Sequence, residues 1–352
     1  MKIIHAADLH IGTPFSRFDR EIARKRNIEL SNTFKTMVEQ AKCLGVKLII
    51  LSGDVFDSDR PFKKDKEFFY SIIASTPEID FLYLRGNHDL KESFERHDIN
   101  NLKIFGSEWI KYSYGNIAVY GIEISPKNER SLYSALHTEF SEFNIVMMHG
   151  QVTNNGEAGK NYIILQKLRN KNIDYLALGH LHSFRKEKLD SRGVWAYSGC
   201  IEGRGFDETG DKGYILLDTD KNTAEFIPCA KRHIIEQKID ISSAVNINSV
   251  IDSIKSQIKA SPEDMISIIV IGRVLFDTKE LSQRLEELLK RKYFYFRAKN
   301  ETLKSYKPED FINDKSLKGE FVRKVLSSDM FDDDKSKVIS LGLKAIDGED
   351  IE

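Results

Sequence analysis

Residues 79–89 read IDFLYLRGNHD, an apolar and aromatic run that ends abruptly in three consecutive polar residues, Asn87, His88 and Asp89. The apolar part is typical of a buried strand. The polar part fits a turn, because glycine, asparagine and aspartate favour turns and bond to the local backbone. Taken alone, this stretch is explained by a turn. The rest of the chain decides whether it also carries chemistry.

Length and composition indicate a globular protein of more than one domain. The chain has 352 residues, which exceeds the usual span of one hydrophobic core, so we expect one large domain and a smaller one. It is 41% hydrophobic and 30% charged, and it contains no apolar run long enough to cross a membrane. The first residues, MKIIHAADLH, meet His5 and Asp8 too early for a signal-peptide core. We therefore expect a cytoplasmic protein without a membrane partner.

Charge and cysteine content exclude some classes of function. The 53 basic and 54 acidic residues nearly balance, which argues against a protein that simply coats DNA. A nuclease stays open, because metal ions and a local basic patch can supply positive charge where phosphate binds. The cysteines, Cys43, Cys200 and Cys229, show no C-x-x-C spacing, so neither a disulfide framework nor a thiolate zinc site is indicated.

Alternating patterns predict an α/β core in the first two thirds of the chain. Helical patterns at 19–44 and 63–75 fall between short β-like runs at 2–7, 47–53, 81–86, 116–122, 143–150 and 173–180. Later runs at 194–199, 213–220 and 223–230 have no helices between them, which favours antiparallel pairing. A β-sandwich with helices on its outer faces fits these patterns as well as an open sheet does.

The pattern restarts after residue 232 and predicts three parts. The large domain covers 1–232. A small β-α-β-α-β domain follows at 233–304, and a tail at 305–352 contains amphipathic helices at 317–326 and 332–346. The apolar positions of the tail can bind a partner's coiled coil, or the two helices can fold back as a pair.

Polar residues that suit catalysis follow the predicted strands at five places. In an α/β sheet, ligand sites form at the carboxyl ends of strands, so residues from distant parts of the chain converge there. Two of the places hold pairs with a spacing of two residues, which puts both side chains on one face of an extended backbone. The five places hold Asp8 and His10, Asp54, Asn87 and His88, His149, and His180 and His182.

This set of donors predicts a metal site. Aspartate, histidine and asparagine without thiolate suit manganese, iron or zinc and argue against copper(I) and iron–sulfur clusters. Seven donors, the residues named above except His88, exceed the needs of one ion. Two ions about 3.5–4 Å apart, bridged by a carboxylate, would use them and would form the usual clamp for phosphoester cleavage. Each block alone has a plainer explanation, since Asp54 fits a turn and His149 a core histidine. Their ordered combination favours the dinuclear site.

The same ordered blocks resemble the calcineurin-like metallophosphoesterases over roughly residues 1–230. Within that superfamily HAADLHIGTPF, GDVFDSDRP, LRGNHD and YLALGHLHSF look most like the SbcD branch, the bacterial counterpart of the meiotic recombination eleven nuclease. The resemblance implies a calcineurin-like β-sandwich flanked by helices, a small capping domain that recognises DNA, and a helical segment that binds an SbcC-type coiled-coil ATPase. It also implies a homodimer that acts in repair of DNA double-strand breaks.

The resemblance further implies a role for each site residue. Two divalent ions are expected, with manganese first and iron or zinc as alternatives. His88 would be the acid that donates to the leaving oxygen, and Asp89 would orient it. The bridging carboxylate would be Asp54, with Asp8, His10, Asp54 and His182 on one ion and Asp54, Asn87, His149 and His180 on the other.

Some positions depart from the family pattern or stay open. Asp57 stands where relatives often have histidine, which puts a metal or substrate contact from that position in doubt. Cys200 stands where relatives often have serine, and we interpret it as a packed small residue. Arg85 and Arg204 are candidate phosphate contacts or, alternatively, ion-pair partners.

We therefore predict an exonuclease or endonuclease that hydrolyses DNA phosphodiesters with two metal ions. One alternative is a related enzyme that acts on small phosphodiesters, nucleotides or phosphoproteins. Another is a scaffold that keeps the fold without catalysis, which the complete set of donors disfavours.

Overall fold

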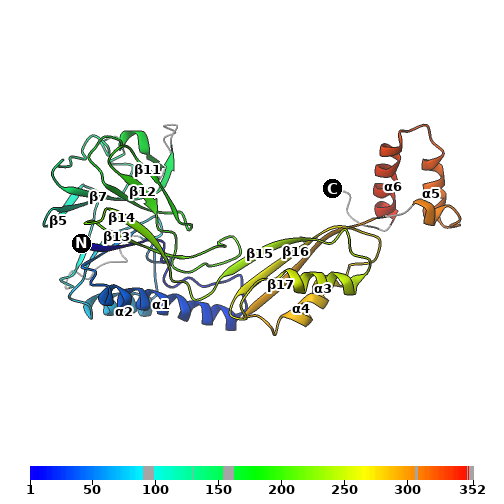
Figure 1. Ribbon diagram of the computed structural model, residues 1–352, viewed down its shortest axis with the longest axis horizontal. Coiled ribbons are helices and arrows are strands. Elements are labelled where there is room, and N and C mark those ends of the chain that lie inside the picture. The colour runs from blue at the N-terminus through cyan, green and yellow to red at the C-terminus, as the bar shows by residue number, and fades with distance from the viewer. Residues whose placement is uncertain (90–98, 130, 154–161, 306–307, 347, 349–352) are drawn as a thin grey trace. The chain divides into compact units, whose positions relative to one another are not determined.

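The computed structural model describes residues 1–89, 99–129, 131–153, 162–305, 308–346 and 348. It divides into two compact units, Met1–Ile234 and Ile235–Glu352 (Figure 1). The second unit includes both the predicted small domain and the described part of the predicted tail. Among the described residues, no helix combines the length and the apolar character needed to cross a membrane.

The first unit is a β-sandwich of two six-stranded sheets, each with four neighbouring parallel strands. The first sheet has antiparallel pairing at one edge only, and the second has it at both edges. The first sheet has the order β14-β13-β1-β2-β3-β4, with β1 (Lys2–Ala6), β2 (Leu48–Ser52), β3 (Asp80–Leu84), β4 (Leu102–Ile104), β13 (Gly213–Asp218) and β14 (Thr223–Pro228). The second has the order β11-β12-β10-β7-β6-β5, with β5 (Ile110–Tyr114), β6 (Ile117–Gly121), β7 (Phe143–His149), β10 (Tyr175–Gly179), β11 (Arg185–Lys188) and β12 (Val194–Tyr197). A separate pair consists of β8 (Gln151–Thr153) and β9 (Tyr162–Ile164).

The two-residue period of the strands builds the core. In β2, Leu48 and Ile50 belong to the cluster between the two sheets, whereas Ile49 and Leu51 belong to the cluster under the helices. Both faces of this sheet are therefore covered, which is why its central strands read as continuous apolar runs. Antiparallel pairing is confirmed for β13 with β14, while β12 pairs antiparallel with β11 and parallel with β10.

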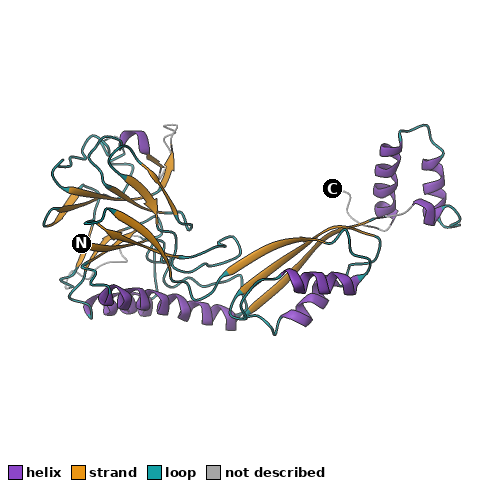
Figure 2. Ribbon diagram, viewed as in Figure 1, coloured by secondary structure: helices purple, strands orange, loops and turns teal. Residues whose placement is uncertain are grey.

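Two helices, α1 (Arg20–Cys43) and α2 (Lys63–Ala74), cover the outer face of the first sheet (Figure 2). The first helix begins where the Asp19 carboxylate accepts hydrogen bonds from the backbone N–H groups of Glu21 and Ile22. The outer face of the second sheet packs instead against Leu132, Leu168 and neighbouring residues, including those of a short 3-10 helix, η2 (Leu165–Lys167). The predicted sandwich flanked by helices is confirmed, with both long helices on one side.

A buried ion pair anchors the segment after β12 to α1. The side chains of Arg26 and Glu202 are both fully buried, and Arg26 Nη2 donates to Glu202 Oε2 over 2.7 Å. The same nitrogen donates to the Gly203 carbonyl, and Thr33 Oγ1 donates to the other Glu202 oxygen. Residues 202 and 203 therefore have a fixed place against the helix, immediately before Arg204.

The second unit contains the predicted β-α-β-α-β arrangement. Strands β15 (Ile234–Asp240), β16 (Met265–Val274) and β17 (Tyr295–Lys304) form one sheet, and α3 (Ile247–Gln257) and α4 (Leu281–Leu289) contribute to its core. After η3 (Pro308–Phe311), the helices α5 (Leu317–Leu326) and α6 (Asp332–Ile346) pack through Val322, Val325, Ile339 and Leu343. Both tail helices have their predicted bounds.

We expect Arg26→Met to destabilise the first unit by about 3–5 kcal/mol, because it leaves the buried Glu202 carboxylate without its positive partner. Urea unfolding followed by circular dichroism measures the change. Arg24→Met, at an exposed position of the same helix, is the matched control and should have little effect. Equal stability of the two variants would contradict the importance of the ion pair.

Candidate metal centre

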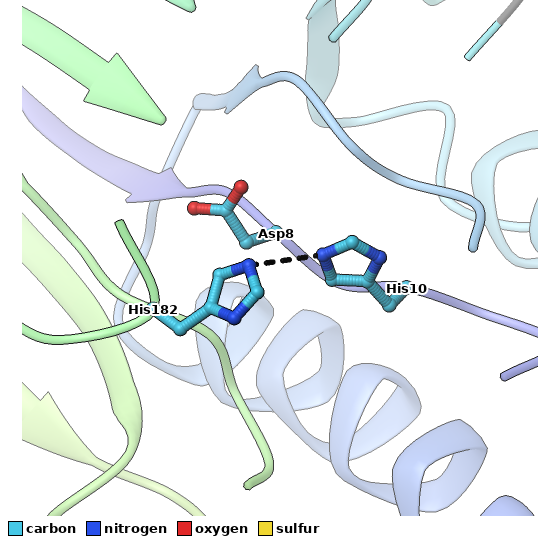
Figure 3. Close-up of side chains that lie close together, drawn as sticks. All are labelled: Asp8, His10 and His182. Atoms are coloured by element: carbon cyan, nitrogen blue, oxygen red, sulfur yellow. Dashed lines mark hydrogen bonds between the residues drawn. The ribbon is translucent and has the colours of Figure 1, made fainter. Parts of the chain in front are cut away.

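The seven predicted donors lie at the carboxyl ends of five strands from both sheets. Asp8 and His10 follow β1, Asp54 follows β2, Asn87 follows β3, His149 ends β7, and His180 and His182 follow β10. Two compact groups of side chains result, each with potential ligand atoms within 4.8 Å of one another. Asp8 belongs to both groups, with His10 and His182 in one (Figure 3) and with Asp54 and His149 in the other.

The first group directs two imidazole lone pairs at each other. His182 Nδ1 lies 2.7 Å from a Glu208 carboxylate oxygen, and His10 Nδ1 lies 3.0 Å from Asp57 Oδ1. Glu208 therefore accepts from the Nδ1–H of His182, and the Asp57 carboxylate beside His10 Nδ1 favours a proton on that nitrogen by its charge. In these tautomers the lone pair of each ring lies on Nε2. The two Nε2 atoms are 3.2 Å apart (Figure 3). Two lone pairs at this distance repel unless a cation lies near both, so the donor set fits a metal ion.

The second group also consists of converging potential ligand atoms. His149 Nδ1 donates to the Ser52 carbonyl over 2.9 Å, so Nε2 is the nitrogen that faces the rest of the group. That nitrogen lies 3.3 Å from Asp54 Oδ2 and 3.1 Å from Asn87 Oδ1. His180 Nδ1 lies 3.3 Å from the same Asn87 oxygen. An imidazole, a carboxylate and an amide oxygen facing one another again match the ligands of a divalent transition ion.

Burial and charge act in opposite directions on the carboxylates of the site. Burial raises the pKa of Asp8 to about 7, against the opposing effect of nearby histidines. Burial is the largest effect on Asp54 and would raise its pKa, but its contacts with His149, the His88 backbone N–H and the charge of His10 together outweigh burial and lower it. Burial is also the largest effect on His149, and the contacts with Asp54, the charge of Asp8 and the Ser52 carbonyl together outweigh it and raise the pKa of His149 to about 9. A proton thus sits between His149 and Asp54 in the metal-free protein, and a bound ion would displace it.

Several of these residues have a strained backbone conformation with positive φ. Asp8, His10 and Asp54 have φ of 52°, 48° and 50°, and His180 has φ of 112°. Such angles are rare for residues with a Cβ and cost about 1–3 kcal/mol each. Hydrogen bonds hold the conformation: the backbone N–H of Asp8 donates to the Gly53 carbonyl, and that of His180 donates to the Asp8 carboxylate. Four of the predicted ligands thus have strained backbones, as do Phe15 and three asparagines elsewhere in the described residues.

Two glycines of the motifs permit the close approach of the strand ends. A Cβ on Gly179 would lie 2.0 Å from the Ser52 carbonyl oxygen and 2.9 Å from His149 Nδ1. A Cβ on Gly86 would lie 2.1 Å from Asp54 Oδ1. Glycine is required at both places because backbone and ligand side chains occupy the space that a side chain would need.

His88 and Asp89 take opposite directions from the turn after β3. His88 is exposed, and its ring lies edge-on to the His10 ring with centroids 5.2 Å apart. Asp89 is buried, and its carboxylate accepts hydrogen bonds from the backbone N–H groups of Val55, Phe56 and Gly86. The predicted orientation of the His88 imidazole by Asp89 is therefore corrected: Asp89 positions His88 through the backbone, by joining the loops after β2 and β3.

The two candidate phosphate contacts form ion pairs. Arg85 holds both oxygens of Glu123, over 2.5 and 3.0 Å. Arg204 donates to Asp57 over 2.7 Å and to Glu208 over 2.9 Å. Both arginines thus correspond to the ion-pair alternative. Glu208 was missed by sequence reasoning, because it lies 26 residues from His182 and no local pattern marks it.

The structure also bears on Asp57 and Cys200. Asp57 Oδ1 lies 3.0 Å from His10 Nδ1, so the Asp57 carboxylate contacts a predicted ligand at the ring nitrogen opposite Nε2. Cys200 is buried, and burial raises the pKa of its thiol. A buried neutral thiol is a poor nucleophile, in agreement with its interpretation as a packed small residue.

The family model of the calcineurin-like phosphoesterases matches residues 1–184, which carry every predicted ligand. The chain belongs to this family. Calcineurin-like phosphoesterases use a dinuclear metal site, and the Asp/His groups described above are the candidate for it in this chain. The predicted enzyme class, a metal-dependent phosphodiester hydrolase, is thereby confirmed at the level of the family.

Several curated proteins resemble the chain over most of its length. DNA double-strand break repair protein Mre11 of Methanosarcina acetivorans is 24% identical over 88% of this chain and 52% of its own length. The protein of the same name from Sulfolobus acidocaldarius is 25% identical over 82% of this chain and 79% of its own. Uncharacterized metallophosphoesterase YhaO of Bacillus subtilis is 25% identical over 72% of this chain and 67% of its own. These matches agree with the SbcD-like resemblance.

The chain spans about half the length of the Methanosarcina acetivorans protein and of the protein of the same name from Methanosarcina mazei. Among solved structures, the protein TT1561 of Thermus thermophilus has a TM-score of 0.45 at 13% identity, over 65% of this chain and 98% of that one. A likeness of this degree says nothing about substrate.

We expect Gly179→Ala to abolish tight binding of divalent ions, because the added Cβ cannot coexist with the Ser52 carbonyl and pushes β10 away from β2. Manganese bound per chain, measured after equilibrium dialysis, reports the effect. Gly106→Ala is the matched control, since nothing lies within 4 Å of a Cβ built there. Two ions bound per chain in the Gly179 variant would show that the close approach is dispensable.

Proposed function

We propose that this protein is a DNA phosphodiesterase that uses two divalent metal ions, with manganese as the expected ion. The observation that carries the proposal is the convergence of two lone-pair donor groups around Asp8, beside the exposed imidazole of His88. The Mre11 relatives favour DNA as the substrate, because their similarity extends over 82–88% of the chain and so beyond the phosphoesterase domain. In this proposal the protein acts in repair of DNA double-strand breaks.

The proposed ligand sets are those that the family resemblance implies. Asp8, His10 and His182 hold one ion, Asn87, His149 and His180 hold the other, and Asp54 is the bridge, while Asp8 is the residue common to the two groups described above. When bound, such ions lower the pKa of water to about 7 and neutralise charge on the phosphoryl oxygens. Asp8 and Asp54 balance the positive charge of the ions, and burial of both carboxylates keeps bulk water away from this side of the site.

The proposed role of His88 is to donate a proton to the leaving oxygen. Its ring is exposed next to the His10 ring, so a substrate lying over the centre can reach it. Its backbone N–H donates to Asp54 Oδ1 over 2.9 Å, which places it at a fixed distance from the proposed bridge. A positioned general acid contributes about 10²–10⁴-fold to such reactions.

The second unit supplies features suited to a polyanion. Between β17 and the segment before α4 lies a hollow of about 240 Å³, lined by Lys279, Lys304, Asn300 and Thr302 among others. Lysine ammonium groups and uncharged hydrogen-bond donors are the usual contacts to a nucleic-acid backbone. We propose residues 233–304 as a capping domain that recognises DNA. We do not propose Arg85 and Arg204 as phosphate contacts, because both form ion pairs with carboxylates.

We propose that the tail binds a coiled-coil ATPase of the SbcC type, with the protein acting as a homodimer. Three of the apolar positions of the tail that could bind a partner, Val325, Ile339 and Leu343, are buried in the helix pair. Other apolar side chains of the tail remain exposed, among them Leu317, Phe331 and Leu341. Exposed apolar residues on paired helices are suited to pack against a partner's coiled coil.

The decisive experiment digests end-labelled linear duplex DNA in manganese, beside a small phosphodiester such as bis(p-nitrophenyl) phosphate. We expect cleavage of DNA, and a loss of about 10²–10⁴-fold in His88→Ala without loss of bound metal. His137→Ala, at an exposed position far along the chain, is the control and should cleave normally. Hydrolysis of the small diester with intact DNA would favour an enzyme of small substrates, in line with the similarity to YhaO.

The partner proposal predicts that Phe331→Asp weakens association with the ATPase, because it places a charge on an exposed apolar position of the tail. Co-purification with the coiled-coil ATPase and analytical ultracentrifugation measure the association. Lys337→Asp, on the exposed surface of α6, is the control for added negative charge. Unchanged association in the Phe331 variant, and in a chain ending at residue 305, would disprove the proposal.

A further inference from the structure

The histidines of the candidate metal centre differ in the group that contacts Nδ1 when Nε2 faces the proposed ion. His10 Nδ1 lies 3.0 Å from the Asp57 carboxylate, and His182 Nδ1 lies 2.7 Å from the Glu208 carboxylate. In the other group, His149 Nδ1 donates to a neutral backbone carbonyl, that of Ser52, over 2.9 Å. His180 Nδ1 faces Asn87 Oδ1, another predicted ligand atom 3.3 Å away, so this nitrogen is itself the donor atom of His180.

This difference changes the strength of the donors. A hydrogen-bond acceptor behind an imidazole fixes its tautomer and its ring orientation, and a carboxylate also makes the opposite nitrogen more basic. A neutral carbonyl fixes the tautomer but adds less negative charge. His10 and His182 therefore present stronger donors than His149, although all of them have a defined tautomer.

Arg204 keeps both carboxylates in place. Its Nη1 donates to Asp57 Oδ1 over 2.7 Å, while its Nη2 and Nε donate to Glu208 Oε1 over 2.9 and 3.1 Å. Its backbone N–H donates to the other Glu208 oxygen over 2.8 Å. Both oxygens of Glu208 thus accept from Arg204, and the adjacent guanidinium balances the charge of the carboxylate.

The arrangement is also anchored away from the metal centre. The Arg26–Glu202 pair fixes the segment that leads into Arg204, as described above. On the opposite side, Asp57 lies three residues after Asp54, in a loop that Asp89 holds by its backbone. The two carboxylates therefore belong to rigid surroundings, which is the condition for orienting a ligand.

We infer that Asp57 and Glu208 are positioning residues that make the ion bound by His10 and His182 the more tightly held of the two. The ion bound by His149, His180 and Asn87 is then the one that exchanges. This inference does not depend on which phosphodiester is cleaved. It assigns a role to the position where relatives often have histidine and to a glutamate that the sequence motifs do not include.

The test is a manganese titration of the metal-free chain, residues 1–352, by isothermal calorimetry. We expect two affinities for the unaltered protein. Glu208→Gln and Asp57→Asn keep the shape of the side chains and remove the charge, and each should weaken the tighter affinity by about 10–100-fold while leaving the weaker one unchanged. Asn87→Ala should weaken the other affinity, which identifies the ion that each value describes.

The matched control is Asp207→Asn. Asp207 belongs to the same segment and pairs with Arg17 over 2.7 Å, and its exposed carboxylate should leave both affinities unchanged. As a spectroscopic check, the visible absorption of the first equivalent of cobalt(II) should change in Glu208→Gln and not in Asp207→Asn. A merely structural role would weaken both ions together and leave this spectrum unaltered.

Several outcomes would overturn the inference. These are equal affinities in the unaltered protein, an unchanged tighter affinity in both carboxylate variants, or parallel weakening of both ions. Since Asp57 is the more exposed of the two carboxylates, with 19% of its side chain accessible against 9% for Glu208, Asp57→Asn decides the question if Glu208→Gln does not fold.

Discussion

Convergence of imidazole and carboxylate groups on one small, buried place is the constraint on which the rest of this structure depends. His10 and His182 face each other through Nε2 atoms 3.2 Å apart, whereas His149 and the Asp54 carboxylate, 3.3 Å apart, attract each other through a shared proton. The strand ends and the hydrogen bonds of their backbones hold all of these groups together. The metal centre is therefore preorganised, so an ion finds its ligands in place instead of collecting them from mobile loops.

Apolar packing elsewhere in the first unit offsets the free-energy cost of this arrangement. Strained φ angles at Asp8, His10 and Asp54 cost free energy, and so does burial of two carboxylates. Three apolar clusters in the first unit, one between the sheets and one on each outer face, supply the opposing stabilisation. Parallel strands in both sheets then deliver their carboxyl ends to one place. Small residues at those ends, such as Gly179, let the two sheets meet there.

The side chains behind the ligands give the centre its asymmetry. Arg204 joins the carboxylates behind His10 and His182, and the Arg26–Glu202 pair fixes the segment that carries it. The candidate ligands lie in the part of the chain that the family model of the calcineurin-like phosphoesterases matches. In our proposal, Asp57 and Glu208 set the relative affinity of the two ions.

The sequence by itself determined most strands, most helices and the candidate ligands, because strand and helix periods and polar strand ends are local signals that survive folding. Five short strands, β4, β5, β8, β9 and β11, lie outside the predicted runs. Only the tertiary structure decided that Asp89 bonds to backbone and not to His88, that Arg85 and Arg204 are ion-pair residues, and that Glu208 lies behind His182. These contacts join residues far apart in the chain. Their partners are chosen by how loops pack at the meeting of two sheets, and no short stretch of sequence records that geometry.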